Sequence, residues 1–83
     1  MKKRQVFSVN KERRKKINVQ ILKLNEVAMM LQELLDEEQD YFDNMPENLQ
    51  GSERGETAEE AIGVLEEAID SLEDIVVSLE EIC

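Results

Sequence analysis

The sequence predicts an all-α fold: an antiparallel helical hairpin that closes into a four-helix bundle by dimerisation. Three observations predict it. Apolar residues recur in alternating steps of four and three along two long segments, which is the spacing of a heptad seam. The only Pro and two of the three Gly lie together between these segments. The two seams also match when the chain folds back on itself, so the 83 residues are expected to form one domain.

The first helix is predicted over residues 10–44, after a basic N-terminal arm of residues 1–9. Ser8 or Asn10 can cap its start. Pro46 ends it, because the residue before a Pro disfavours the helical conformation. The apolar seam of this helix is interrupted once, by Glu38, which we interpret as a device that sets register or specificity. Its members are Ile17, Ile21, Leu24, Ala28, Leu31, Leu35, Glu38, Phe42 and Met45.

Residues 45–56, MPENLQGSERGE, are predicted to be the linker, with room for a short turn at Pro46–Leu49. The second helix is predicted over residues 57–83, because Thr57-Ala58-Glu59-Glu60 has the spacing of a capping box. From Glu59 onward the sequence repeats every seven residues as EEAIGVL, EEAIDSL, EDIVVSL and EEIC. Its seam consists of Ala58, Ile62, Leu65, Ile69, Leu72, Val76, Leu79 and Cys83.

The two seams pair well in the antiparallel direction, where the numbers of facing residues must add to a constant. With that constant at 100, Ile17 faces Cys83, and small residues face large ones at Ala28 with Leu72 and at Phe42 with Ala58, as close packing favours. One flank of this pair carries Asn and Gln on the first helix and Glu on the second, and is polar. In this register, the basic N-terminal segment extends past the end of the second helix.

The other flank is almost wholly apolar, and a two-helix unit cannot cover it. Small scaffolds of this size usually need oligomerisation or another staple, and contiguous exposed apolar surface is typical of contact sites. We therefore expect self-association, with a dimer favoured; an N-terminal arm folded over this flank in a monomer is the alternative. The predicted self-association residues are Val27, Leu34, Tyr41, Ala61, Ala68, Ile75 and Ile82.

Composition excludes most catalytic chemistry. The chain has no His and one Cys, so His-based triads, imidazole–zinc sites and internal disulfides are absent. No glycine-rich phosphate loop is present either. We expect a protein that is not an enzyme and binds no cofactor or metal. The absence of an export signal or a long apolar run predicts a cytoplasmic location without membrane contact.

Charge is segregated along the chain, although its net value is −10. Nine of the ten basic residues lie within residues 1–23, whereas residues 24–83 hold nineteen of the twenty acids. Paired acids recur in each heptad of the second helix, and they fit either a face that mimics nucleic acid and binds a basic partner or a solvated face that keeps the chain soluble. These acids are Glu59, Glu60, Glu66, Glu67, Glu73, Asp74, Glu80 and Glu81.

The basic segment has two interpretations. Arg13, Arg14, Lys15 and Lys16 can contact nucleic-acid phosphates or an acidic partner. They can also offset Glu80 and Glu81 at the C-terminal end of the second helix, where the helix dipole disfavours acids. No aromatic residues are interleaved for base stacking and the rest of the chain repels nucleic acid, so nucleic-acid binding is the less favoured interpretation.

The chain resembles small acidic helical-hairpin proteins encoded by phages and prophages of Gram-positive bacteria. The resemblance lies in KERRKKI (Lys11–Ile17), in FDNMPENLQGSERGE (Phe42–Glu56) and in the EEAI and LEEAIDSLE runs (Glu59–Glu73). It implies a mobile-element setting and assigns no site residues.

The expected function is a protein-binding helical module, in a phage setting a modulator or inhibitor of a host nucleic-acid-handling or defence protein that acts through its acidic face. The alternatives are a self-assembling coiled-coil scaffold protein and a nucleic-acid-binding accessory protein that uses the basic arm.

Overall fold

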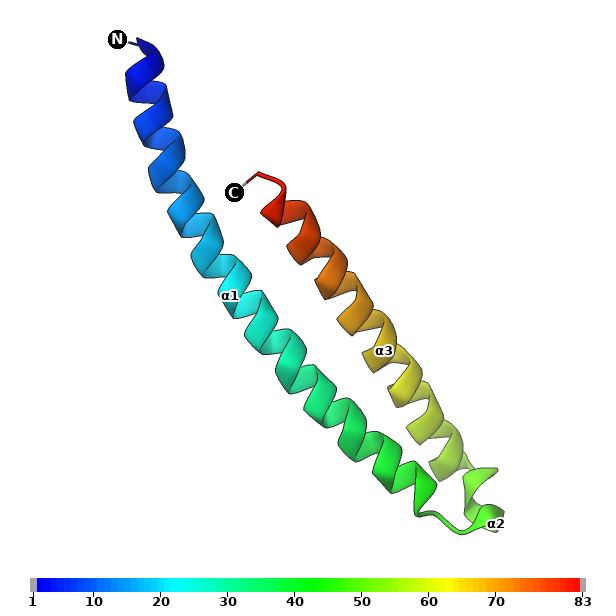
Figure 1. The fold of residues 1–83 in the computed structure, drawn as a ribbon. Helices are drawn as coiled ribbons and strands as arrows, with labels where there is room; N and C mark the ends of the chain where they lie inside the picture. Colours follow the sequence, from blue (N-terminus) through cyan, green and yellow to red (C-terminus); the bar gives the residue numbers. More distant parts are fainter. Residues whose placement is uncertain (1, 83) are drawn as a thin grey trace.

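Two long helices and one short helix make up the computed structural model, which describes residues 2–82, with side chains from Lys11 to Ile82. Helix α1 spans Lys2–Asp43, α2 spans Glu47–Gln50 and α3 spans Glu53–Glu80. Helices α1 and α3 run antiparallel beside each other, and α2 lies where the chain reverses (Figure 1). The molecule measures 72 × 14 × 14 Å between its outermost Cα atoms. The predicted all-α helical hairpin is therefore confirmed.

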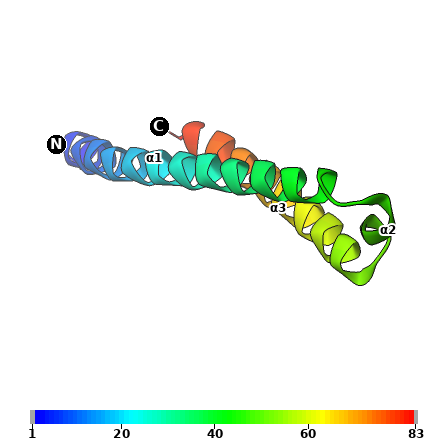
Figure 2. The same cartoon turned by 90° about the horizontal axis from the view of Figure 1, so that it is seen from below.

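The hairpin has two different ends. At the closed end, residues 44–52, which include α2, connect the long helices. At the open end, α1 continues past the last turn of α3, as the sequence predicts (Figure 1). Seen from below, the long helices cross at a shallow angle (Figure 2). Such a crossing is expected when heptad seams wrap around each other.

The heptad seams form the core. On α1, every side chain from Lys11 to Phe42 that is buried or half-buried is a predicted seam residue, and Ile21 is only 5% exposed. On α3, Ala58, Ile62, Ile69 and Val76 are buried and the intervening Leu side chains are half-buried. No large side chain within the described residues is completely buried. The core is thus a single thin layer between two helices.

The pairing register follows the predicted one. Tyr41 and Glu38 line the same surface groove as Ala58 and Ala61, and on the opposite flank Phe42 and Gln39 share a groove with Glu59 and Ile62. At the open end, Arg14 bonds to the backbone of Ile82. These neighbours agree with the seam pairing to within about one helical turn.

The helix boundaries differ from the predicted ones at the N-terminus. Helix α1 begins at Lys2, so the backbone of residues 2–9, predicted as an arm, continues helix α1, and the helix runs through Ser8 and Asn10. No Gly or Pro interrupts residues 2–43, and the Lys, Arg and Gln residues there are good helix formers. The side chains of residues 2–10, together with Met1 and Cys83, lie outside the described part of the chain.

The linker is more structured than predicted. Helix α3 begins at Glu53, four residues before the predicted start, with Ser52 in an extended conformation at its N-cap. Thr57 does not cap the helix; its hydroxyl donates to the carbonyl of Glu53, 2.9 Å away, inside the first turns of α3. Glu53 and Glu56 supply the negative charge that the N-terminal end of a helix favours. Helix α3 ends at Glu80, three residues before its predicted end.

Packing at the closed end explains this early start. Helix α2 folds back against the first turn of α3, and Gly55 is buried beneath it. A Cβ atom at Gly55 would lie only 2.5 Å from the carbonyl carbon of Gln50 and 2.7 Å from its Cα. Glycine is therefore required for the two backbones to approach so closely.

The side chain of Gln50 ties the linker to α1. Its amide donates to the carbonyl of Phe42 at 3.1 Å and to that of Met45 at 3.3 Å. These carbonyls lie at and just after the C-terminus of α1, where the regular helical donors run out; the carbonyl of Phe42 also accepts from the backbone N–H of Met45 at 3.1 Å. Met45, the last residue of the first seam, is buried beside them. Gln50, Met45 and Gly55 together fix the reversal of the chain.

Candidate protein interaction surfaces

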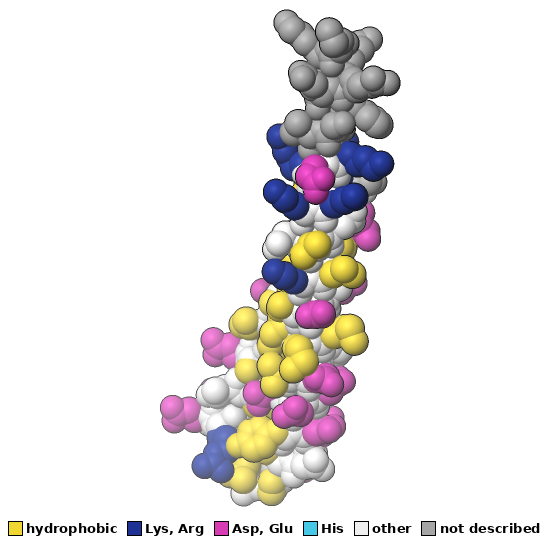
Figure 3. Space-filling model, turned by 90° about the vertical axis from the view of Figure 1, so that its left-hand side faces the viewer, with side chains coloured by type: hydrophobic (Ala, Val, Ile, Leu, Met, Phe, Trp, Pro, Cys, Tyr) yellow, Lys and Arg dark blue, Asp and Glu magenta, His cyan; other side chains and the backbone are white. Residues whose placement is uncertain are grey.

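The predicted self-association residues form an exposed apolar stripe on one flank of the hairpin. The large side chains Val27, Leu34, Tyr41, Ile75 and Ile82 are each 47–49% exposed. Ala61 and Ala68 are half-buried between the two helices. We call these seven residues the apolar stripe. The side of the molecule that faces left in Figure 1 has hydrophobic side chains gathered along its middle, below a band of Lys and Arg (Figure 3).

The heptad explains why the stripe is exposed. Its members all occupy the position that directly precedes a seam position, so they flank the core without entering it. The partner helix of the hairpin covers only the side of each residue that faces the seam. About half of each large side chain therefore remains in contact with water, and a further helix would be needed to cover it.

A groove continues the stripe at the closed end. Tyr41, Ala58 and Ala61 line it together with Leu49 from α2 and Arg54 from the first turn of α3. Two carboxylates, those of Glu38 and Glu53, also line it. The half-buried seam residue Glu38 thus faces an open groove beside the stripe. A second groove, lined by Thr57, Ala61 and Val64 among others, adjoins it on α3.

Leu49 and Arg54 were not among the residues predicted for any site. Both lie in the segment predicted as a linker, where the sequence indicates a short turn at Pro46–Leu49. Their place beside Tyr41 depends on how α2 packs against α3, and no local pattern in the sequence encodes that packing. Pro46 and the Gly residues indicate a turn there but not its direction.

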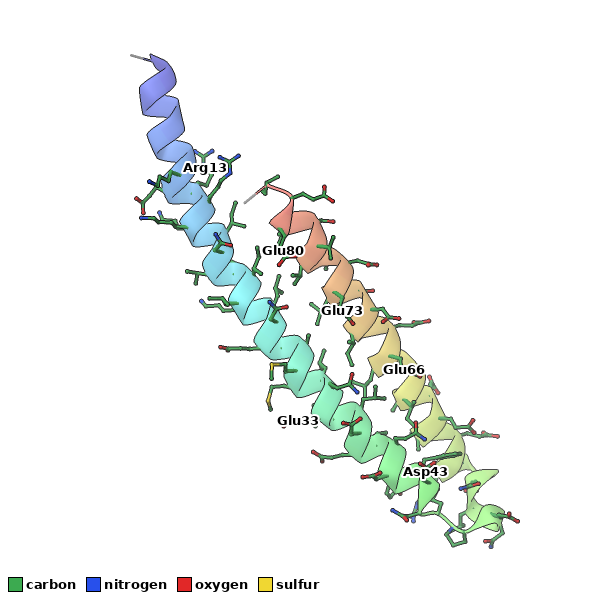
Figure 4. The ribbon with its side chains drawn as sticks, viewed as in Figure 1. Arg13, Glu33, Asp43, Glu66, Glu73 and Glu80 are labelled. Atoms are coloured by element: carbon green, nitrogen blue, oxygen red, sulfur yellow. The ribbon has the colours of Figure 1, made fainter. Side chains whose placement is uncertain are left out.

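The predicted acidic face is fully exposed. All eight of its acids are exposed; seven lie on α3 and Glu81 directly follows its last residue. Glu66, Glu73 and Glu80 follow one another along the helix (Figure 4). On the facing edge of α1, the amides of Gln32 and Gln39 donate to Asp36 and Asp43 of their own helix, at 3.2 and 3.1 Å. Exposure is what both predicted interpretations of this face require, so the geometry does not separate mimicry from solvation.

The basic cluster lies at the open end. Arg13, Arg14, Lys15 and Lys16 are exposed on α1, and Arg13 lies near the level at which α3 finishes (Figure 4). The guanidinium of Arg14 donates to the carbonyl of Ile82, just after the C-terminus of α3. A cation at this position is favourable because the helix dipole is negative there. Arg14 of the basic cluster therefore contacts the end of the hairpin, while the predicted offset of Glu80 and Glu81 stays a prediction.

Further apolar side chains are exposed on α1 away from the seam. Leu22, Met29 and Met30 are 57–70% exposed, and Val19 is nearly half exposed. Exposed Met side chains are flexible and polarizable, which suits adaptable contacts. The middle of α1 therefore offers apolar surface outside the stripe as well.

The described residues contain neither a metal-binding cluster nor a membrane-spanning helix. Between Lys11 and Ile82, no group of three or more Cys, Asp or Glu converges so that it could hold a metal ion. None of the helices in the described part of the chain combines the length and apolar character that a membrane span needs. Comparisons with family models, curated proteins and solved structures give no match to this chain.

Proposed function

We propose that this protein is a protein-binding helical module whose binding surface is the apolar stripe. One observation carries the proposal: the seams of α1 and α3 already bury one another, yet five large apolar side chains, spaced by heptads along one flank, remain about half exposed beside them. Scattered apolar residues are normal on protein surfaces, whereas contiguous rows are typical of contact sites.

Burial of the stripe supplies binding energy. Covering the exposed half of a large aliphatic side chain stabilises a complex by about 1 kcal/mol on the usual scale for apolar area. Five such side chains give about 5 kcal/mol before the costs of association are subtracted. Stripe binding therefore suits a partner that also contributes polar or charged contacts.

The resemblance to phage and prophage proteins supports a host protein as the target of such a module, and it is the only support for a modulator role. The acidic face offers a second surface for a basic partner. Because a solvated helix face would look the same, this surface does not carry the proposal.

Affinity capture with three forms of the chain tests the proposal. The stripe variant carries Val27→Glu, Leu34→Glu and Ile75→Glu; the acidic-face variant carries lysines at Glu66, Glu67, Glu73 and Asp74. All seven positions are exposed, so both variants should stay helical, which circular dichroism checks.

The proposal requires that binding partners, including further copies of the chain, are retained by the wild type and by the acidic-face variant and lost from the stripe variant. Partners retained equally by all three forms would contradict it. Partners lost only from the acidic-face variant would favour the nucleic-acid-mimicking function instead.

A further inference from the structure

The stripe lies between two regions of opposite charge. Towards the open end, residues 11–23 hold six Lys and Arg and one acid, and Glu80 and Glu81 at the end of α3 lie beside them, which leaves a net charge of +3. Towards the closed end, residues 36–60 hold ten Asp and Glu and one base. Antiparallel pairing places residues 36–43 of α1 beside the start of α3, so these acids gather at one end of the hairpin. The stripe itself contains no charged residue.

The stripe is large enough for a dimer of this chain. Between Ala61 and Ile82 it extends about 32 Å at the rise of an α-helix, and two adjacent helices are about 20 Å wide. A partner of the same shape would cover about 640 Å² on each copy, or about 1,300 Å² in total, which lies within the range of specific interfaces. A second hairpin also matches the stripe in length, because it carries the same stripe.

Charge decides how the two copies are oriented. In a parallel dimer the basic segments would lie beside each other, and so would the acidic closed ends. Two like charges about 10 Å apart in water repel by about 0.4 kcal/mol before screening by salt, and each end would hold many such pairs. An antiparallel dimer replaces these repulsions with attractions between residues 11–23 of one copy and residues 36–60 of the other.

The groove at the closed end agrees with the antiparallel arrangement. A two-fold axis through the middle of the stripe, near residue 30 of α1, places the segment of the second copy around Lys16–Gln20 opposite this groove. The groove offers the carboxylates of Glu38 and Glu53 beside the apolar surface of Tyr41 and Ala61. Carboxylates next to an apolar surface suit a segment that carries both Lys and apolar residues.

We infer that the occupant of the apolar stripe is a second copy of this chain, bound antiparallel, so that the basic segment of each copy lies beside the acidic closed end of the other. This rests on the proposed function, which makes the stripe a binding surface. The dimer is a four-helix bundle with its two closed ends at opposite poles. Its symmetry is two-fold, so the same stripe residues of both copies form the interface.

Spin labels at the closed end test the orientation directly. Asn48 on α2 is exposed and lies outside the stripe, so Asn48→Cys in a Cys83→Ser background gives one label per chain. Pulsed dipolar spectroscopy then measures the distance between the labels of two copies. The antiparallel dimer predicts about 50 Å, which is twice the helical rise from the middle of the stripe to the closed end. A parallel dimer predicts about 20 Å, the width of the bundle.

A distance near 50 Å that disappears when Val27→Glu, Leu34→Glu and Ile75→Glu are added supports the inference. A distance near 20 Å overturns the antiparallel orientation and leaves the stripe as the binding surface. If there is no dipolar coupling and the protein has the mass of a monomer, the second copy is overturned as the occupant. The proposed function is then decided separately, by whether partners captured by the wild type are lost from the stripe variant. A coupling that survives the stripe substitutions overturns both.

Discussion

Replacing Gly55 by Ala tests whether the closed end is built as described. The added Cβ would lie 2.5 Å from the carbonyl carbon of Gln50, whereas ordinary contacts begin at 3.4 Å. The carbonyl oxygen of Gln50 would lie closer still, and because both atoms are backbone, α2 must move by about an ångström or more. Overpacking of this kind costs about 1–3 kcal/mol, and the shift also weakens the hydrogen bonds of Gln50, worth about 1 kcal/mol each. The higher helix propensity of Ala offsets only about 1 kcal/mol of this cost.

Gly63 provides a matched control on the same helix. It is exposed, and a Cβ there would meet nothing within 4 Å. Gly63→Ala should therefore stabilise the protein by about 1 kcal/mol, while Gly55→Ala should destabilise it by about 1–3 kcal/mol. Urea unfolding followed by circular dichroism, with all forms at one protein concentration, measures both changes. If Gly55→Ala stabilised the protein as Gly63→Ala does, the close packing of α2 on α3 would be wrong.

Three further substitutions follow from the same structure. Gln50→Ala should lower the free energy of unfolding by about 1–2 kcal/mol because the carbonyls of Phe42 and Met45 each lose a side-chain hydrogen bond. Asn48→Ala in the same short helix should change it by less than about 0.5 kcal/mol, and equal effects would argue against the tie. Ile69→Ala should cost about 2–5 kcal/mol as a cavity in the core, and the exposed Val77→Ala less than about 0.5 kcal/mol, both read from urea midpoints. Arg14→Ala should raise amide hydrogen exchange severalfold in the last turn of α3 alone, and unchanged exchange there would remove its capping role.

The long-range pairing of the hairpin was predictable because each of the two helices carries its own apolar seam and the two seams match. Each seam alternates steps of four and three residues, and when the facing numbers add to 100, small residues face large ones at Ala28 with Leu72 and at Phe42 with Ala58. Ile21 and Ile69 are buried for this reason. The exposure of Leu34 and Ile75 follows from the same heptad, since a position beside the seam cannot enter it.

The closed end was not predictable in the same way. Gly55 looks like a helix breaker in the sequence, yet it lies in the first turn of α3 because the backbone of Gln50 passes over it. Thr57 has the spacing of a capping residue, yet the helix begins at Glu53. Both depend on contacts between α2, α3 and the end of α1, and tertiary contacts override local preference. For the same reason the groove that includes Leu49 and Arg54 had no signal in the sequence.

The mass of the protein in solution tests the role of the apolar stripe most directly. Sedimentation equilibrium at micromolar concentration should give twice the chain mass of 9.6 kDa for the wild type. The variant with Val27→Glu, Leu34→Glu and Ile75→Glu should give 9.6 kDa while keeping its helical signal. A wild-type chain that sediments as a monomer, or a dimer that the three glutamates leave intact, would contradict a stripe covered by a second copy.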